Sequence, residues 1–300
     1  MEPGLNTTEC FARTEASCSS CAQGQLVSLR GSTVKKLRLL AILAHPDDES
    51  LGFGGSLAKY AAEGVETFLV TATRGEAGRF GTAGKGHDPA EVGRVREMEL
   101  RAAAELLGVK EVSILGYPDG GVDRVEPATA IREIVSHIRR IRPDLVVTFG
   151  PEGAYGHPDH IAISQFATAA AVCAADASYQ AGDAAPHRVA KFYYLAWGSE
   201  KWAAYQAAFK KLTIAVDGVE RQAAPWPQWA VTTRVDASAV WRTVWNAVCR
   251  HETQMSVYEK LGELSTEQQI VLWGSQEFYR VFSAVNGGRE VERDLFEGLR

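Results

Sequence analysis

Apolar and polar positions along this 300-residue chain follow a pattern of short buried strands, each followed by an amphipathic helix. Residues 37–44 form an almost continuous apolar run, and similar runs recur at 66–73, 111–116 and 145–149. Segments with helical spacing follow them, at about 56–63, 90–107 and 127–141 and from 160 to about 175. Apolar strands joined by helical crossovers are typical of a parallel sheet covered on both faces. The pattern predicts an α/β fold with a Rossmann-like, mostly parallel sheet flanked by helices.

The C-terminal half is less regular. Strands are predicted at 189–197, 211–216 and 229–235, and a helix at about 199–210. Asp236 is expected to cap the next helix, and Ser265 to open a capping box for another. This predicts a mixed α/β C-terminal part within one domain spanning 35–300. Residues 1–34 are rich in Ser, Thr, Gly and Glu without periodicity, and we expect a flexible N-terminal extension there.

Composition narrows the class of protein. The chain is 46% hydrophobic and 23% charged, with a net charge of −5 that argues against nucleic acid as a partner. No apolar run reaches the roughly 18 residues that a membrane span needs. Five cysteines include a Cys18-Ser-Ser-Cys21 pair that lacks the second half of a zinc site, and Cys173 and Cys249 lie in apolar helical patterns. A disulfide framework is not expected, and cytoplasmic residence fits best.

Polar clusters follow four of the predicted strands, at 45–49, 74–76, 119 and 155–160. The carboxyl ends of parallel strands lie along one edge of a sheet, so these clusters can converge on one crevice. The first and last both contain His-Pro-Asp, and both place potential ligands three residues apart: His45 with Asp48, and His157 with His160. Two imidazoles and one carboxylate with an open position are typical of catalytic zinc.

Two motifs carry a resemblance to a known family, Ala44-His45-Pro46-Asp47-Asp48-Glu49 and Gly156-His157-Pro158-Asp159-His160. In this order and separation they resemble the LmbE/PIG-L family of zinc-dependent N-acetylglucosaminyl deacetylases, which includes the deacetylases of the mycothiol and bacillithiol pathways. The resemblance covers roughly residues 37–260. Weaker matches are Thr73-Arg74-Gly75-Glu76-Ala77-Gly78, Arg96 with Glu99, Pro118-Asp119-Gly120 and His251-Glu252-Thr253-Gln254.

The resemblance implies roles for individual residues. The metal, zinc or another divalent transition metal, would be held by His45, Asp48 and His160. Asp47 would be the general base, since the side chains of adjacent residues diverge and one cation is unlikely to hold both carboxylates. Stabilisation or protonation of the reaction intermediate would fall to His157, oriented by Asp159, and to Tyr155. The expected substrate-binding residues are Arg74, Glu76, Asp119 and His251.

Structural alternatives stay open for several of these residues. Asp159 could be an acid at the start of a helix, and Tyr155 could be a packing residue of a loop. Arg74 and Asp119 could form surface ion pairs, and His251 could be a histidine of the core. Arg96 and Glu99, three residues apart on a predicted helix, are interpreted as a solvated pair. Substrate choice is assigned to the loops 75–90 and 176–188.

The resemblance implies a metal-dependent hydrolase that removes an N-acetyl or other N-acyl group from an amino sugar or its conjugate. The expected partner is that small-molecule substrate, and a homo-oligomer is left open. One alternative is a metal-dependent phosphoesterase on the same ligands. Another is a non-catalytic nucleotide- or sugar-binding module, because Gly52-Phe53-Gly54-Gly55 follows a strand and opens a helix.

Overall fold

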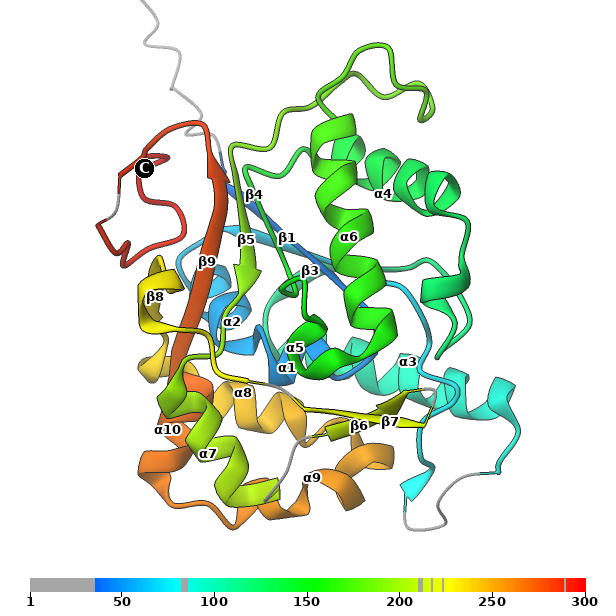
Figure 1. Ribbon diagram of the computed structural model, residues 1–300, viewed down its shortest axis with the longest axis vertical. Coiled ribbons are helices and arrows are strands. Elements are labelled where there is room, and N and C mark those ends of the chain that lie inside the picture. The colour runs from blue at the N-terminus through cyan, green and yellow to red at the C-terminus, as the bar shows by residue number, and fades with distance from the viewer. Residues whose placement is uncertain (1–35, 82–85, 210–212, 217, 223, 289) are drawn as a thin grey trace, which may run out of the picture. The chain divides into compact units, whose positions relative to one another are not determined.

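A seven-stranded sheet in the order β3-β2-β1-β4-β5-β9-β8 forms the centre of the fold (Figure 1). The computed structural model describes residues 36–300 apart from 82–85, 210–212, 217, 223 and 289. The predicted extension at 1–34 therefore lies outside the described residues, and the single domain over 35–300 stays a prediction.

Five strands of the sheet are parallel, as the apolar runs predict. The two remaining strands, β9 and β8, add to β5 in antiparallel pairing. Most residues of β1 and β4 are fully buried because helices cover both faces of the parallel part. The strands are β1 (Arg38–Leu43), β2 (Glu66–Thr71), β3 (Val109–Ile114), β4 (Leu145–Thr148), β5 (Lys191–Leu195), β8 (Thr233–Asp236) and β9 (Ser275–Ser283).

Helices lie on both faces of the sheet. On one face α4 (Pro127–Ile141) packs against α6 (Pro158–Cys173), and both contact β1 (Figure 1). On the other face lie α2 (Gly54–Ala62) and α3 (Pro89–Leu106), packed against α8 (Trp241–Val248). The Rossmann-like expectation is thereby confirmed for the first half of the chain.

The C-terminal half is mixed, as predicted, with a helix and a strand close to those expected at 199–210 and 211–216, but β9 and the elements at 219–222 and 255–262 were not predicted. It contains α7 (Ser199–Phe209), the hairpin β6 (Thr213–Val216) with β7 (Val219–Gln222), α9 (Met255–Gly262) and α10 (Thr266–Gly274). The capping box at Ser265 is present. The prediction that Asp236 caps the next helix is wrong, because α8 begins only at Trp241 with Val240 as its N-cap. Asp236 Oδ1 instead accepts the N–H of Ser238, at the start of a 3-10 turn over Ser238–Val240.

The strand order reverses direction beside β1, since β2 and β3 lie on one side of it and β4 and β5 on the other. Such a switch point leaves a crevice outside the carboxyl ends of the strands, where ligands bind in open α/β sheets. Residues 176–188 join the end of α6 to the start of β5, so this loop lies at the opposite edge of the sheet. Assigning substrate choice to that loop is therefore wrong.

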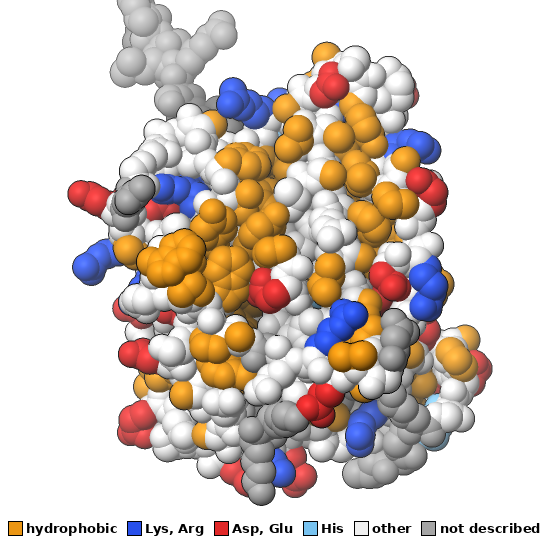
Figure 2. Space-filling model, in the orientation of Figure 1, with side chains coloured by type: hydrophobic (Ala, Val, Ile, Leu, Met, Phe, Trp, Pro, Cys, Tyr) orange, Lys and Arg blue, Asp and Glu red, His pale blue; other side chains and the backbone are white. Residues whose placement is uncertain are grey.

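Part of the sheet carries an apolar face that no described helix covers. Hydrophobic side chains gather over β5 and β9 in Figure 2, where no helix lies across the sheet in Figure 1. There the ring of Tyr279 lies 6.5 Å from that of Tyr194 and 5.6 Å from that of Trp226. Among the described helices, none combines the length and the apolar character needed to cross a membrane.

Candidate active site

The first strand leads into His45, Asp47 and Asp48, which line the crevice, and Glu49, which is fully buried. After β1 the chain turns at Pro46, and the short helix α1 (Asp48–Leu51) begins two residues later. The turn is fixed by Asp48, whose Oδ2 accepts the N–H groups of Ala44 at 3.2 Å and His45 at 2.8 Å. Asp47 has φ 106°, a conformation unfavourable for any side chain. Strain of this kind persists where the surroundings hold it in place, and it is concentrated at functional sites.

The second motif stands at the start of α6. Pro158 occupies the first helical position, and His157 caps the helix by accepting the N–H of Asp159 at Nδ1, 3.2 Å away. Before it, the one-turn segment α5 (Gly153–Gly156) holds Ala154 at φ 63°. Both segments that supply histidines therefore carry a residue with positive φ.

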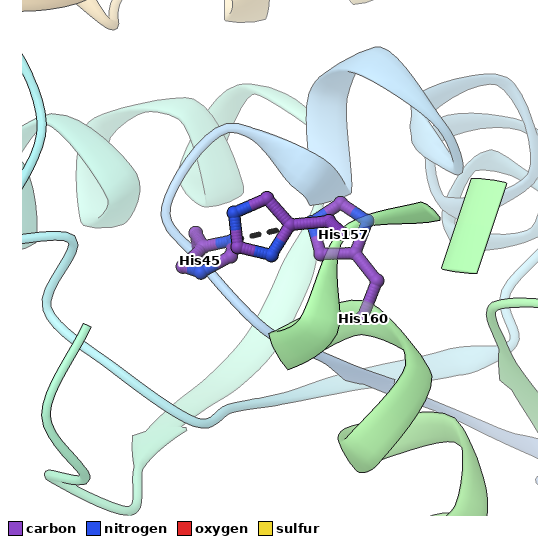
Figure 3. A group of neighbouring side chains, drawn as sticks. All are labelled: His45, His157 and His160. Carbon is purple, nitrogen blue, oxygen red and sulfur yellow. Dashed lines mark hydrogen bonds between the residues drawn. The ribbon is translucent and has the colours of Figure 1, made fainter. Parts of the chain in front are cut away.

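These two segments bring the predicted metal ligands together. His45 Nδ1 lies 3.2 Å from His160 Nε2, and the Asp48 carboxylate faces both rings, with Oδ2 3.7 Å from His45 Nδ1 and Oδ1 3.4 Å from His160 Nε2. Figure 3 shows the imidazole of His157 beside the other two, and its ring centroid lies 4.8 Å from each. Donors about 2.1 Å from a tetrahedral zinc ion lie roughly 3.4 Å apart, and the two ring nitrogens and the Asp48 carboxylate lie close to that spacing.

The other ring nitrogen of His45 faces two further carboxylates. Its Nε2 lies 3.1 Å from both Asp119 Oδ1 and Asp159 Oδ2. Backbone N–H groups fix these acids, because Asp159 accepts from Gly120 and Val122, and Asp119 accepts from Ala77. A histidine that donates one N–H to a carboxylate presents its other nitrogen to a metal.

Carboxylates dominate the charge of this cluster of side chains. Burial opposes protonation of His45, but hydrogen bonds to Asp119 and Asp159 and the charge of Asp48 raise its pKa to about 10. Burial and the neighbouring carboxylates of Asp47 and Glu49 raise the pKa of Asp48 to about 7, despite the opposing effect of His45. A divalent cation between these side chains would offset the repulsion. The donor set and its charge therefore fit a metal ion.

Two groups of three side chains offer ligand atoms that lie within 4.8 Å of one another. The first is His45, His157 and His160, so His157 could also bind a metal, and the second is His45, Asp119 and Asp159. The second set converges on Nε2 of His45, which makes Asp119 and Asp159 supports of that ring. The carboxylate of Asp159 thus lies against His45; only its backbone N–H contacts His157.

Asp47 lies beside this cluster and has partners of its own. Its Oδ2 accepts hydrogen bonds from Arg96 Nη2 at 2.9 Å and from Tyr258 Oη at 2.8 Å. Its backbone N–H donates to Glu49 Oε2, and Glu49 Oε1 lies 2.8 Å from Nε2 of the fully buried His251. Glu49 and His251 therefore hold the strained backbone of Asp47 in place.

The remaining predicted site residues are placed differently. Tyr155 lines the crevice, with its ring centroid 5.4 Å from that of His160. Glu76 accepts the N–H of Asp119 and thereby holds that loop. Arg74 is exposed and pairs with Glu97, the surface ion pair left open as its alternative. His251 has no exposed surface and contacts Glu49, so in this geometry it is a supporting residue and cannot contact a substrate.

Two residues of the site were missed in sequence. Arg96 is 4% exposed, so the interpretation of a solvated pair with Glu99 is wrong; Glu99 instead accepts two hydrogen bonds from Thr253. Arg96 also donates to the carbonyls of Gly75 and Pro46. Its motif match with Glu99 was the available signal. For Tyr258 no motif marks the residue, which comes from α9.

The glycine cluster after β1 serves packing. Gly52, Gly54 and Gly55 are buried, and a Cβ on Gly55 would lie 2.7 Å from the carbonyl oxygen of Trp273. A pyrophosphate has no access to backbone that is covered in this way. The nucleotide-binding alternative therefore loses the feature that suggested it.

With this geometry established, comparison with known proteins defines the class. The family described as PIG-L, GlcNAc-PI de-N-acetylase, matches residues 40–171, which contain both His-Pro-Asp motifs. A curated relative from Streptomyces griseus subsp. griseus is 36% identical over 87% of this chain and 89% of its own length. The chain belongs to the PIG-L (LmbE) family.

The relative from Streptomyces griseus is named 1D-myo-inositol 2-acetamido-2-deoxy-alpha-D-glucopyranoside deacetylase. Among solved structures, a conserved protein of Thermus thermophilus is 26% identical with a TM-score of 0.59, covering 84% of this chain and 97% of that one. The N,N'-diacetylchitobiose deacetylase of Pyrococcus horikoshii has a TM-score of 0.61 at 20% identity and covers 81% of this chain and 83% of its own. At that identity the likeness to the Pyrococcus enzyme concerns the fold alone.

Proposed function

We propose that this chain is a metal-dependent N-deacetylase that hydrolyses the acetamido group of an N-acetylglucosamine-type substrate. The observation that carries the proposal is that two adjacent acids contact different partners. Asp48 faces His45 and His160 at ligand spacing, whereas Asp47 is held apart from them by Arg96 and Tyr258. A hydrolase that uses metal-activated water needs a metal ligand set and a separate base, and Asp48 would belong to the first while Asp47 would be the second.

The metal ligands would be His45 through Nδ1, His160 through Nε2 and Asp48 through its carboxylate. A zinc ion, when bound there, supplies Lewis-acid polarisation of the amide carbonyl and makes water acidic enough to be deprotonated near neutral pH. Asp119 and Asp159 keep His45 in the tautomer that leaves Nδ1 free, because both face its Nε2.

Asp47 would take the proton from the attacking water. Its Oδ2 is occupied by two donors, which orients the carboxylate and leaves Oδ1 as the proton acceptor. Tyr155 and His157 would act on the tetrahedral intermediate that the attack produces. Burial and the surrounding carboxylates raise the pKa of Tyr155 well above its usual value, so its phenol stays protonated and can donate to the developing oxyanion.

His157 would stabilise the tetrahedral intermediate. Because Nδ1 accepts the N–H of Asp159, the ring proton of the neutral imidazole resides on Nε2, where it can donate a hydrogen bond. Burial and the nearby His45 lower the pKa of His157 to about 4, which favours this neutral form. The leaving nitrogen of an amide must be protonated before the C–N bond breaks, and Asp47 would supply the proton that it took from the attacking water.

The substrate class rests on two observations. The curated relative is named for an inositol conjugate of 2-acetamido-2-deoxyglucose, and the chain covers 89% of that relative. Beside the ligands lies a polar cavity of about 280 Å³, lined among others by Arg96, Asp119, Gly120 and Gln254. Donors and acceptors of this kind suit the hydroxyl groups of a sugar.

The test is release of a primary amine, followed with fluorescamine, from N-acetylglucosamine-inositol and from simpler N-acetylglucosamine glycosides. The protein is assayed after chelation and again after zinc is restored, with a sugar phosphate monoester as a parallel substrate. We expect amine release that zinc restores and no phosphate release. Phosphate release without amine release would favour the phosphoesterase alternative, and amine release that persists after verified metal removal would contradict the metal-dependent mechanism.

A further inference from the structure

Two cavities of opposite character meet at the reaction centre. They share Asp47, Asp48, Tyr155, His160 and Tyr258. The polar cavity continues from these residues toward Asp119 and Gln254. The other, about 360 Å³ in volume, continues along an apolar wall formed by Leu51, Phe149, Leu195, Trp197, Tyr205 and Val257. We call this second cavity the acyl chamber.

The two sides of a scissile amide differ in the same way. An amino sugar carries hydroxyl groups on the nitrogen side, and these need the donors and acceptors of the polar cavity. The acyl side carries only carbon and hydrogen beyond its carbonyl. We propose that the acyl chamber binds the substrate's acyl group and admits N-acyl chains several carbons longer than acetyl. This inference rests on the proposed deacetylase function and extends its substrate class.

The volume of the chamber exceeds what an acetyl group uses. An engineered apolar cavity of about 150 Å³ is enough to bind benzene. The chamber, including its part beside the residues shared with the polar cavity, has a volume of about 360 Å³, whereas acetyl would place a single methyl group against its apolar wall. An apolar chain of several carbons would cover wall surface that acetyl leaves in contact with water, and that burial favours binding.

Two aromatic side chains of the chamber wall pack against each other. The ring of Trp197 stacks on Tyr205 with centroids 4.5 Å apart and an interplanar angle of 16°. The hydroxyl of Tyr205 already donates to the carbonyl of Leu51 at 3.1 Å. At the rim, Val257 is 39% exposed, so a chain longer than the chamber can continue toward solvent. The geometry therefore sets no sharp upper limit on chain length.

The experiment is a series of glucosamine derivatives N-acylated with acetyl, butyryl, hexanoyl and octanoyl groups, with amine release measured for each by the zinc-loaded protein. Burial of one methylene is worth about a fourfold gain, so kcat/KM should rise about fourfold per methylene through hexanoyl. A steady fall from acetyl onward would overturn the inference and leave the deacetylase function standing. Amine release from none of the derivatives would mean that the proposed function itself fails.

A second arm tests the other occupant, the group attached to the anomeric carbon. Octyl N-acetylglucosaminide carries the same alkyl chain on the opposite side of the sugar. We expect it to be cleaved no better than methyl N-acetylglucosaminide. If the octyl glycoside gains as much as the N-octanoyl derivative was expected to gain, and the latter is not cleaved, the chamber binds the aglycone and the inference is wrong.

Filling the chamber provides the matched variants. Leu195→Trp places a larger side chain in the chamber wall. Val257→Trp does the same at the partly exposed rim, where the extra volume does not have to fit into the core. In at least one folded variant, the ratio of kcat/KM for N-octanoyl to that for N-acetyl substrate should fall tenfold or more. The control is Val172→Trp on α6, where the side chain is 65% exposed, and it should keep the wild-type ratio. Unchanged ratios in both folded chamber variants would contradict the inference.

Discussion

Asp47 and Asp48 are neighbours in sequence with separate surroundings. Backbone N–H groups and two histidines face Asp48, whereas a guanidinium and a phenol hold Asp47. The αL-like backbone of Asp47 turns its side chain away from the ligand group. The chemistry available to each carboxylate is therefore set by one backbone conformation and by contacts with distant segments.

Replacing each acid with its amide should separate the two roles. Asp47→Asn keeps the shape and removes the basicity, so zinc should stay bound while kcat falls roughly 10²–10⁴-fold. Asp48→Asn should weaken zinc binding, and excess metal should restore part of the rate. Metal content by elemental analysis and steady-state kinetics measure both effects. Loss of zinc in Asp47→Asn with retention in an inactive Asp48→Asn would reverse the assignment.

Tyr258 orients Asp47 without belonging to the ligand group. Tyr258→Phe removes one hydrogen bond to the carboxylate, and such bonds to charged groups are worth about 1.5–3 kcal/mol. We expect kcat to fall roughly 10- to 100-fold with zinc content unchanged. Tyr179→Phe, at the opposite edge of the sheet, is the matched control and should retain the wild-type rate. A full loss of zinc in Tyr258→Phe would show that the residue supports the metal site instead.

At the scale of elements, the regular half of the chain was predictable and the C-terminal half only in part. Buried strands and amphipathic helices leave distinct periodic patterns, and these placed β1 to β5 and the helices α2, α3, α4, α6 and α7 to within a few residues. The nine-residue strand β9 was missed because α10 ends at Gly274 and β9 begins at Ser275, with no turn segment between them. A helix that continues directly into a strand gives no boundary signal.

The antiparallel end of the sheet is joined to the C-terminal segment by Glu292. Its carboxylate accepts hydrogen bonds from Lys191 and Tyr193 of β5 and from Thr233 of β8, each at 2.7 Å. Burial alone would raise the pKa of Glu292, but these bonds lower it to about 2, against an ordinary value of 4.5. A depressed carboxyl pKa stabilises the fold above pH 4.5, and this contribution is lost as the pH falls from 4.5 toward 2.

Glu292→Gln should remove that dependence. It leaves Lys191 buried without its counterion, and breaking a buried pair lowers the free energy of unfolding by about 3–5 kcal/mol near neutral pH. Urea unfolding between pH 2 and 7, with chelator present in every sample, should give a flatter profile for the variant than for the wild type. Glu290→Gln, at an exposed position nearby, should leave the profile unchanged. Identical slopes for Glu292→Gln and wild type below pH 4.5 would contradict this account.

For the whole molecule, topology explains which parts of the site could be predicted from sequence. The four polar clusters follow parallel strands, and the order of those strands places the ends of β1 and β4 side by side. His45 and His160 could therefore be brought together by a general rule. The partners of Asp47 could not, because Arg96 reaches it from the middle of α3 and Tyr258 from α9, across packing that no local pattern encodes.

A metal at this position would connect segments that the chain separates by more than a hundred residues. It would bind the folded state and not the dispersed ligands of the unfolded chain, so it should stabilise the fold by mass action. At zinc concentrations 100 times Kd the gain is about 2.7 kcal/mol, which corresponds to roughly 5–10 °C in Tm for a domain of this size. Scanning calorimetry of chelated and zinc-restored protein measures the shift. His160→Ala should abolish it, whereas Glu292→Gln, lower in Tm but with the ligands intact, should retain it. An equal shift in His160→Ala would place the stabilising metal elsewhere on the protein.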